Sequence, residues 1–290
     1  MFYVIKNDLI EVEISNIGAE ILSIKLNGVN YIKDGNPKYW AGRSPIMFPI
    51  CGRLYSGGYT FNGTRYEMPL HGIVKTAQFT VTNQAKNSIT FELKSSEESK
   101  ITYPFDFTFA VTYTVKNNSL ITEFSVKNDG EITMPFSLGA HPGFTVPIAG
   151  VGEFEDCYIE FSTPCPAKKV NLSKTCFLTG NDTLYTGENL KIIPLKHELF
   201  NNDAIFLYDT AKTVTLKSSK SPHSIKVDFE GFKYIGFWQS ANTDADFICI
   251  EPWTGIPSTD GIVDDFSTKK DMATLESGKT FTLSYVITVE

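Results

Sequence analysis

Apolar and polar residues alternate along three long stretches of the chain, and this pattern predicts β-strands. In residues 105–115 every odd position is aromatic or aliphatic, while the even positions carry Asp, Thr or Ala. Residues 120–126 continue the alternation after the turn Asn117-Asn118, and residues 281–289 repeat it near the C-terminal end. A repeat of two is typical of a strand with one buried face. The first two stretches therefore predict a β-hairpin.

Shorter apolar stretches separated by turn residues predict further strands along the whole chain. These expected strands cover residues 9–14, 20–26, 77–83, 88–94, 157–161, 204–208, 214–217, 224–229 and 234–239. No stretch has a long helical period, and short helical turns are expected only at residues 37–40 and 195–200. No linker, internal repeat or low-complexity segment interrupts the pattern. The sequence therefore predicts an all-β fold, a single large antiparallel β-sandwich, with one domain over residues 1–290.

Composition and charge narrow the classes of function. The chain has 26 Lys and Arg against 33 Asp and Glu, a net charge of −7, and no long basic run. This balance argues against nucleic acid and anionic membranes as partners. The five cysteines are irregularly spaced and form no C-x-x-C pair, which predicts reduced, mostly buried thiols in a cytoplasmic protein. Neither a secretion signal nor an apolar stretch long enough to cross a bilayer is visible.

His141 lies in the segment Ser-Leu-Gly-Ala-His-Pro-Gly-Phe, between small residues and a Pro-Gly pair. These neighbours predict a rigid turn rather than the interior of a helix or strand. An imidazole has an ordinary pKa of about 6.5, so a turn that presents it to a cleft suits a catalytic proton donor. Taken alone, the segment is equally compatible with a turn histidine that only bonds to the backbone.

Glu251 follows the apolar residues 247–250, which predict a buried strand that Pro252 should end. A carboxylate at the end of a buried strand either faces water or has a function, because burying an unpaired charge is costly. Trp253 adds a flat ring beside the carboxylate, and such rings suit the apolar faces of sugars. Further polar candidates on predicted loops and strand ends are Arg53, His71 and Asp203.

Five short segments, in chain order, resemble those of the aldose 1-epimerase (galactose mutarotase) family, and most closely its bacterial branch of LacX-like proteins. They are Phe-Pro-Ile-Cys-Gly-Arg ending at Arg53, Leu-His-Gly around His71, Ala-His-Pro-Gly-Phe around His141, Asn-Asp-Ala-Ile with Asp203, and Ile-Glu-Pro-Trp with Glu251. The resemblance covers nearly the whole chain. It implies a galactose mutarotase-like sandwich and an isomerase that interconverts the α and β anomers of a hexose.

The resemblance also implies roles for these residues. His141 would be the general acid and Glu251 the general base of sugar-ring opening, while Arg53, His71 and Asp203 would bind sugar oxygens. We expect His141 and Glu251 to face each other across one cleft, with room for the edge of a sugar ring between them. A nearby carboxylate should raise the pKa of His141. Their two titrations predict a bell-shaped pH–rate profile.

Departures from the family pattern leave the sugar open. Here Ile73-Val74-Lys75 follows the first histidine motif, where relatives often have Phe-Ala-Arg. A hexose 6-phosphate is an alternative substrate, and it would need a cationic pocket, for example one built from Arg43 with Arg53 or Lys75. The sequence favours a surface charge over a phosphate-binding role for Arg43. A third possibility is a sugar-binding or regulatory protein without useful turnover.

The expected chemistry needs no redox cofactor or metal. The four histidines, at positions 71, 141, 197 and 223, form no closely spaced pair, so the sequence predicts no metal site. The expected partner is a small-molecule sugar, and a homodimer is left open.

Overall fold

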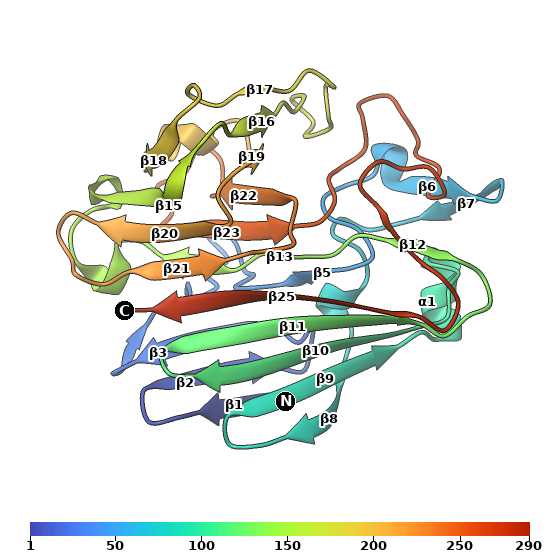
Figure 1. Cartoon of the computed structure of the whole chain (residues 1–290), viewed down its shortest axis with the longest axis horizontal. Helices are drawn as coiled ribbons and strands as arrows, with labels where there is room; N and C mark the ends of the chain where they lie inside the picture. The colour runs from blue at the N-terminus through green and yellow to red at the C-terminus, as the bar shows by residue number, and fades with distance from the viewer.

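Antiparallel strands make up almost all regular structure in the computed structural model, which describes residues 1–290 (Figure 1). The larger sheet has nine strands. In spatial order they are β18 (Leu190–Pro194), β15 (Cys157–Cys165), β20 (Thr213–Ser218), β21 (Ile225–Asp228), β25 (Thr280–Val289), β11 (Ser119–Asn128), β10 (Phe107–Lys116), β9 (Ser88–Lys94) and β8 (Thr80–Gln84). Figure 1 shows the long strands β25, β11, β10 and β9 side by side.

A second large sheet has eight strands and carries the residues discussed below. Seven of them follow the order β17 (Thr183–Leu184), β16 (Lys168–Val170), β19 (Ile205–Tyr208), β22 (Tyr234–Trp238), β23 (Phe247–Trp253), β13 (Gly139–Ala140) and β5 (Ile46–Met47), and β14 (Gly143–Thr145) also pairs with β23. A four-stranded sheet contains β1 (Phe2–Lys6), β2 (Ile10–Ser15), β3 (Ile21–Leu26) and β4 (Val29–Asn30). Two further sheets have two strands each. One is the hairpin of β6 (Gly58–Phe61) and β7 (Thr64–Glu67), and the other pairs β12 (Met134–Phe136) with the distant β24 (Ala273–Leu275).

Helical structure is short. The one α-helix, α1 (Glu97–Thr102), begins at a Ser96 cap whose side chain accepts the N–H of Ser99. Five 3₁₀ turns cover Tyr55–Gly57, Val74–Thr76, Ile148–Gly150, Phe154–Asp156 and His197–Phe200. No helix in the structure has both the length and the apolar character needed to cross a membrane.

The predicted hairpin is confirmed as β10 and β11, which pair from Phe107↔Asn128 to Lys116↔Ser119. Every odd position of β10 is buried, as the alternation predicted. These side chains belong to a core cluster of 63 buried hydrophobic residues. The expected all-β, antiparallel fold class is therefore confirmed, and each predicted strand is present with bounds shifted by a few residues at most ends.

Three local expectations need correction. Residues 37–40 form a turn without a helix, whereas the helical turn expected at 195–200 is a 3₁₀ turn at His197–Phe200. Helix α1 was not anticipated, because its six residues are too few to show a helical period. Pro252 does not end its strand. The N–H groups of Ile250 and Thr254 donate to the carbonyls of Pro142 and Leu138, so the ladder continues on both sides of the missing proline donor.

Candidate active site

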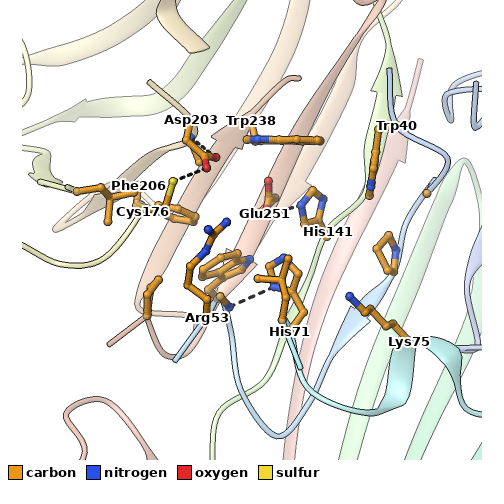
Figure 2. A pocket seen from close by; sticks show the side chains of 18 of the residues that line it. Trp40, Arg53, His71, Lys75, His141, Cys176, Asp203, Phe206, Trp238 and Glu251 are labelled. Atoms are coloured by element: carbon orange, nitrogen blue, oxygen red, sulfur yellow. Dashed lines mark hydrogen bonds and ion pairs between the residues drawn. The ribbon is translucent and has the colours of Figure 1, made fainter. Parts of the chain in front are cut away.

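One pocket of about 410 Å³ collects the candidate residues named from the sequence. Its lining includes all six of them, namely Arg53, His71, His141, Asp203, Glu251 and Trp253. In the view of Figure 2, Glu251 and His141 lie at the centre, Asp203 and Cys176 on one side, and Trp40 and Lys75 on the other. Segments up to two hundred residues apart in sequence thus meet at the eight-stranded sheet, whose strands β13, β14, β19 and β23 hold or flank most of these side chains.

The catalytic candidates sit on neighbouring strands. His141 occupies the expected turn between β13 and β14, and its backbone N–H donates to the carbonyl of Pro45. Glu251 lies within β23 directly opposite Gly236 of β22. A side chain on Gly236 would come within 2.6 Å of the Phe206 ring and 3.3 Å of the Glu251 Cβ atom. Because Gly236 has no side chain, the Phe206 ring and the Glu251 side chain can occupy the space above it.

His141 and Glu251 are in direct contact inside the protein. Their Nε2 and Oε2 atoms are 3.3 Å apart, and the two residues are only 7% and 1% exposed. Neither carboxylate oxygen of Glu251 has a hydrogen-bond partner, and Nδ1 of His141 also lacks one. The water-facing role considered for Glu251 is excluded by this burial. The expectation of room between the two groups is also wrong, because a 3.3 Å separation of Nε2 and Oε2 admits no sugar atom between them.

Burial shifts both groups toward their neutral forms. The pKa of His141 falls from its ordinary value to about 3, mainly because desolvation disfavours the imidazolium. Desolvation raises the pKa of Glu251 well above its ordinary value, and the charge of Asp203 adds to this effect. The sequence argument that the carboxylate would raise the pKa of His141 is therefore wrong, because the cost of burying the charge dominates. Both shifts favour a neutral imidazole beside a protonated carboxyl group, and the titration of this contacting pair belongs to both groups.

His71 is fixed against the backbone that carries Arg53. Its N–H donates to the carbonyl of Gly52, and its ring Nδ1 accepts the N–H of Gly52 at 3.1 Å. Because Nδ1 is an acceptor, the neutral ring carries its proton on Nε2. Burial lowers the pKa of His71 well below its ordinary value, and the neighbouring His141 adds to the effect. His71 is therefore a neutral hydrogen-bond donor in the pocket.

Asp203 and Arg53 approach the pocket with few partners. Asp203 precedes β19 in a left-handed backbone conformation, with φ of 73°, and its Oδ1 accepts the N–H of Ala204. Its Oδ2 accepts the thiol of Cys176 at 2.7 Å. Arg53 Nη1 donates to the carbonyl of Thr175 at 3.4 Å. Most of the donors of the guanidinium remain able to bind a ligand.

Aromatic rings form the walls of the pocket. Trp40 lies 4.8 Å from His141 between ring centroids, and Trp238 lies 5.3 Å from it. Trp253 packs 4.3 Å from Phe206, and its indole N–H is buried without a partner. Sequence reasoning identified Trp253 but missed the other two tryptophans. The available signal in the sequence was the small number of tryptophans, three in the whole chain. All three line this one pocket.

The three cations considered for a phosphate are placed differently, and the expectation of a cationic pocket centred on Arg43 is wrong. Lys75 lines the pocket, whereas Arg43 does not and instead donates from Nη1 to the carbonyl of Leu22. Arg43 is therefore half-buried and held by the backbone, and it is neither a pocket cation nor a free surface charge. Among the lining residues the one contact between a basic and an acidic side chain is His141–Glu251, so Lys75 and Arg53 have no carboxylate partner.

Three potential metal ligands also meet at the centre. The donor atoms of His141, Cys249 and Glu251 all lie within 4.8 Å of one another, and all three residues are buried. Spacing along the sequence did not reveal this cluster, because its members come from a turn and from alternate positions of one strand. Burial raises the pKa of the Cys249 thiol well above its ordinary value. A metal ion would have to displace protons from both Cys249 and Glu251 to bind here.

Comparison with known proteins places this site in a family context. The aldose 1-epimerase family model matches residues 1–266. The plasmid-encoded protein LacX of Lactococcus lactis subsp. lactis is 35% identical over 267 residues, which cover 88% of each chain. A crystal structure of a galactose mutarotase related enzyme from Lactobacillus acidophilus has a TM-score of 0.96 and 34% identity, covering 100% of this chain and 97% of that one. A galactose mutarotase-like protein from Lactobacillus casei has a TM-score of 0.94 and 27% identity, with both chains fully covered.

Proposed function

The chain belongs to the aldose 1-epimerase family, and from this premise we propose that it interconverts the α and β anomers of a free hexose by general acid–base ring opening and closure. The resemblance noted in the sequence is thereby confirmed at the level of the family. One structural observation supports the proposed activity in addition to the family membership. A buried carboxylate without hydrogen bonds lies 3.3 Å from a buried imidazole, inside a pocket walled by aromatic rings.

Ring opening requires a proton to leave the C1 hydroxyl and a proton to reach the ring oxygen. In the proposed mechanism Glu251 takes the first and His141 donates the second. The form active in opening is therefore the carboxylate with the imidazolium. After opening, Glu251 is protonated and His141 is neutral, and the reverse transfers close the ring on either face of C1. Each positioned transfer typically contributes about 10²–10⁴-fold to the rate.

The protonation preferences of the site fit this cycle. Burial favours the neutral pair, which is the form that closes the ring, over the charged pair, which opens it. The two forms have the same number of protons and differ only by transfer between groups 3.3 Å apart. Bound hydroxyl groups that donate to the carboxylate would stabilise the charged form. The protein therefore needs no outside proton donor during a turnover.

The remaining polar groups are suited to orient the sugar. Nε2–H of His71 and the guanidinium of Arg53 donate hydrogen bonds, and the carboxylate of Asp203 accepts them. The rings of Trp40, Trp238 and Trp253 provide apolar surface against which C–H faces of a pyranose can pack. We propose these residues as substrate contacts.

Lys75 supports a second candidate substrate, a hexose 6-phosphate. The lysine lines the pocket without a carboxylate partner, at the side opposite Asp203 in Figure 2. A phosphate dianion would pair with it, whereas a free hexose leaves the ammonium group unpaired. Arg53 would supply a second cation from the other side of the catalytic pair.

Polarimetry of freshly dissolved sugars tests the proposal and separates these candidates. Optical rotation is followed after dissolving α-D-glucose, α-D-galactose or α-D-glucose 6-phosphate, with and without protein. We expect faster approach to equilibrium with at least one free hexose. Acceleration restricted to the phosphate would select the second candidate.

A non-catalytic sugar-binding protein gives a different result. All three tryptophans line the pocket, so their fluorescence reports binding of a sugar without a label. A change in fluorescence on adding a sugar, together with no acceleration for any of the three, would refute the proposed enzymatic function and support a binding role.

A further inference from the structure

The segment of residues 171–179 borders the side of the pocket on which Asp203 lies. Its two ends pair through a bridge between Leu172 and Leu178. The N–H of Leu178 donates to the carbonyl of Ser258, so the segment is also fastened to the chain that follows β23. These backbone bonds hold the tip of the segment at the rim of the pocket.

Cys176 at this tip contacts Asp203 directly (Figure 2). Its thiol donates to Oδ2 of Asp203 at 2.7 Å, while the N–H of Ala204 donates to Oδ1 at 2.8 Å. Each carboxylate oxygen is therefore held by one donor. Since each can accept a further hydrogen bond, Asp203 stays able to receive sugar hydroxyls.

Cys176 differs from the other cysteines of the chain. It is half-buried and lines the pocket, whereas Cys51, Cys157, Cys165 and Cys249 are buried. The same segment also contacts Arg53, whose Nη1 donates a hydrogen bond to the carbonyl of Thr175. Two of the proposed sugar contacts, Asp203 and Arg53, thus touch the segment that carries this thiol.

We propose that Cys176 is a positioning residue whose thiol holds the Asp203 carboxylate in the orientation that accepts sugar hydroxyls. This inference rests on the proposed function, because it assigns Asp203 to the sugar. It separates affinity from chemistry, since Cys176 acts at Asp203 while the proton transfers occur at His141 and Glu251. Loss of the thiol should therefore raise KM and leave kcat nearly unchanged.

Kinetics of two substitutions at this position provide the first test. Cys176→Ala removes the donor, and we expect KM to rise by roughly 3- to 10-fold, because a thiol is a weak donor even to a charged acceptor. Cys176→Ser keeps a donor and should restore most of the affinity. Lys174→Ala is the matched control, since Lys174 is an exposed neighbour on the same segment. Equal KM values for wild type and Cys176→Ala would overturn the proposal.

Reactivity of the thiol gives a readout that a purely structural role would not change. Burial and the adjacent Asp203 carboxylate raise the pKa of Cys176 to about 11, so little reactive thiolate exists at pH 8. Asp203→Asn removes the charge, and we expect several-fold faster alkylation of Cys176 by iodoacetamide, followed by peptide mass spectrometry. Asp182→Asn is the control, because that carboxylate contacts Tyr208 instead. Alkylation that is equally slow in Asp203→Asn would contradict the thiol–carboxylate bond.

The results distinguish a failure of the positioning role of Cys176 from a failure of the proposed enzymatic function. If the wild type accelerates no sugar but Asp203→Asn still speeds alkylation, the enzymatic function is refuted and the Cys176–Asp203 bond stands. The effect of Cys176→Ala on affinity is then measured by tryptophan fluorescence with D-galactose and D-glucose. An unchanged affinity there would overturn the positioning role.

Discussion

In the nine-stranded sheet, β10 and β11 pair residue by residue over their full length of ten residues each. In the eight-stranded sheet, β23 is flanked on one side by two short pieces, β13 and β14, which pair with it through one residue and three residues. The turn between those pieces carries His141. The interruption of the sheet is therefore what brings a histidine into contact with a strand carboxylate.

Polar burial distinguishes the two regions as well. Four buried polar atoms around the pocket lack partners, namely Nδ1 of His141, both carboxylate oxygens of Glu251 and the indole nitrogen of Trp253. Each such atom costs about 1–3 kcal/mol of folding free energy. The buried face of the β10–β11 hairpin is mostly aromatic and aliphatic, and Oγ1 of Thr122 is its one buried side-chain polar atom without a partner. We infer that burial of apolar side chains in the regular sheet offsets the folding free energy lost by burying polar groups at the pocket.

The largest effect should follow from changing the histidine. His141→Asn keeps a polar side chain but has no titratable group, so we expect the catalysed rate to fall by about 10²–10⁴-fold. The melting temperature should change little. His223→Asn serves as the control, because that ring lies outside the pocket and bonds to Tyr31 and Glu290. Comparable loss of rate in both variants would remove the special role of His141.

The reverse behaviour is expected in the regular sheet. Phe124 is fully buried on β11, with its ring 5.9 Å from that of Tyr285. Phe124→Ala should lower the free energy of unfolding by about 3–5 kcal/mol, measured by urea denaturation, through lost burial and a cavity. The folded fraction should keep its kcat. Glu123→Ala, on the exposed face of the same strand, should change stability by less than about 0.5 kcal/mol. A large loss of kcat in folded Phe124→Ala would show that the regions are coupled.

A smaller effect is expected from pH. Burial lowers the pKa of His141 to about 3 and raises that of Glu251, so between these two titrations the pair keeps one proton. The rate should fall in acid, when a second proton binds, and in alkali, when the last one leaves. After subtracting the spontaneous rate, we expect kcat to be nearly constant from about pH 5 up to the pH at which the pair loses its last proton. An acid limb centred near pH 6.5 would instead indicate an ordinary, solvated histidine.

The smallest effect is expected from removing metal ions. We propose that His141 and Glu251 act as proton carriers, and a metal at the cluster they form with Cys249 would occupy the same atoms. Incubation with EDTA should therefore leave the rate unchanged, and added Zn²⁺ should inhibit if it binds there. Loss of activity in EDTA that is restored by a metal would overturn the acid–base account.

The sequence predicted the regular parts of the fold because their burial follows a simple period. Phe107 to Val115 alternate without exception, and β10 results. Helix α1 has no period to detect, although Ser96 followed by Glu97 and Glu98 is a helix-start signal that could have been used. Pro252 has no N–H and therefore donates no hydrogen bond to the neighbouring strand, but the hydrogen bonds of Ile250 and Thr254 on either side keep the strand intact.

Short motifs led to the six candidate residues, all of which line one pocket, but their mutual arrangement was not predictable. The 3.3 Å contact of His141 with Glu251 depends on packing between β13, β14 and β23. Trp40 and Cys176 enter from segments that carry no recognisable motif. The protonation of the pair follows from burial, which a sequence does not give directly. Roles of the individual residues stay predictions.

The measurement that tests the central claim most directly is the rate of anomerisation by Glu251→Gln at saturating hexose. The amide preserves the size of the side chain but cannot take a proton from the C1 hydroxyl. We predict that its rate falls to the spontaneous value while tryptophan fluorescence still reports binding of the sugar. Glu160→Gln, which changes a carboxylate paired with Lys191 and Lys217 outside the pocket, should keep the wild-type rate. A wild-type rate in Glu251→Gln would contradict the proposed mechanism.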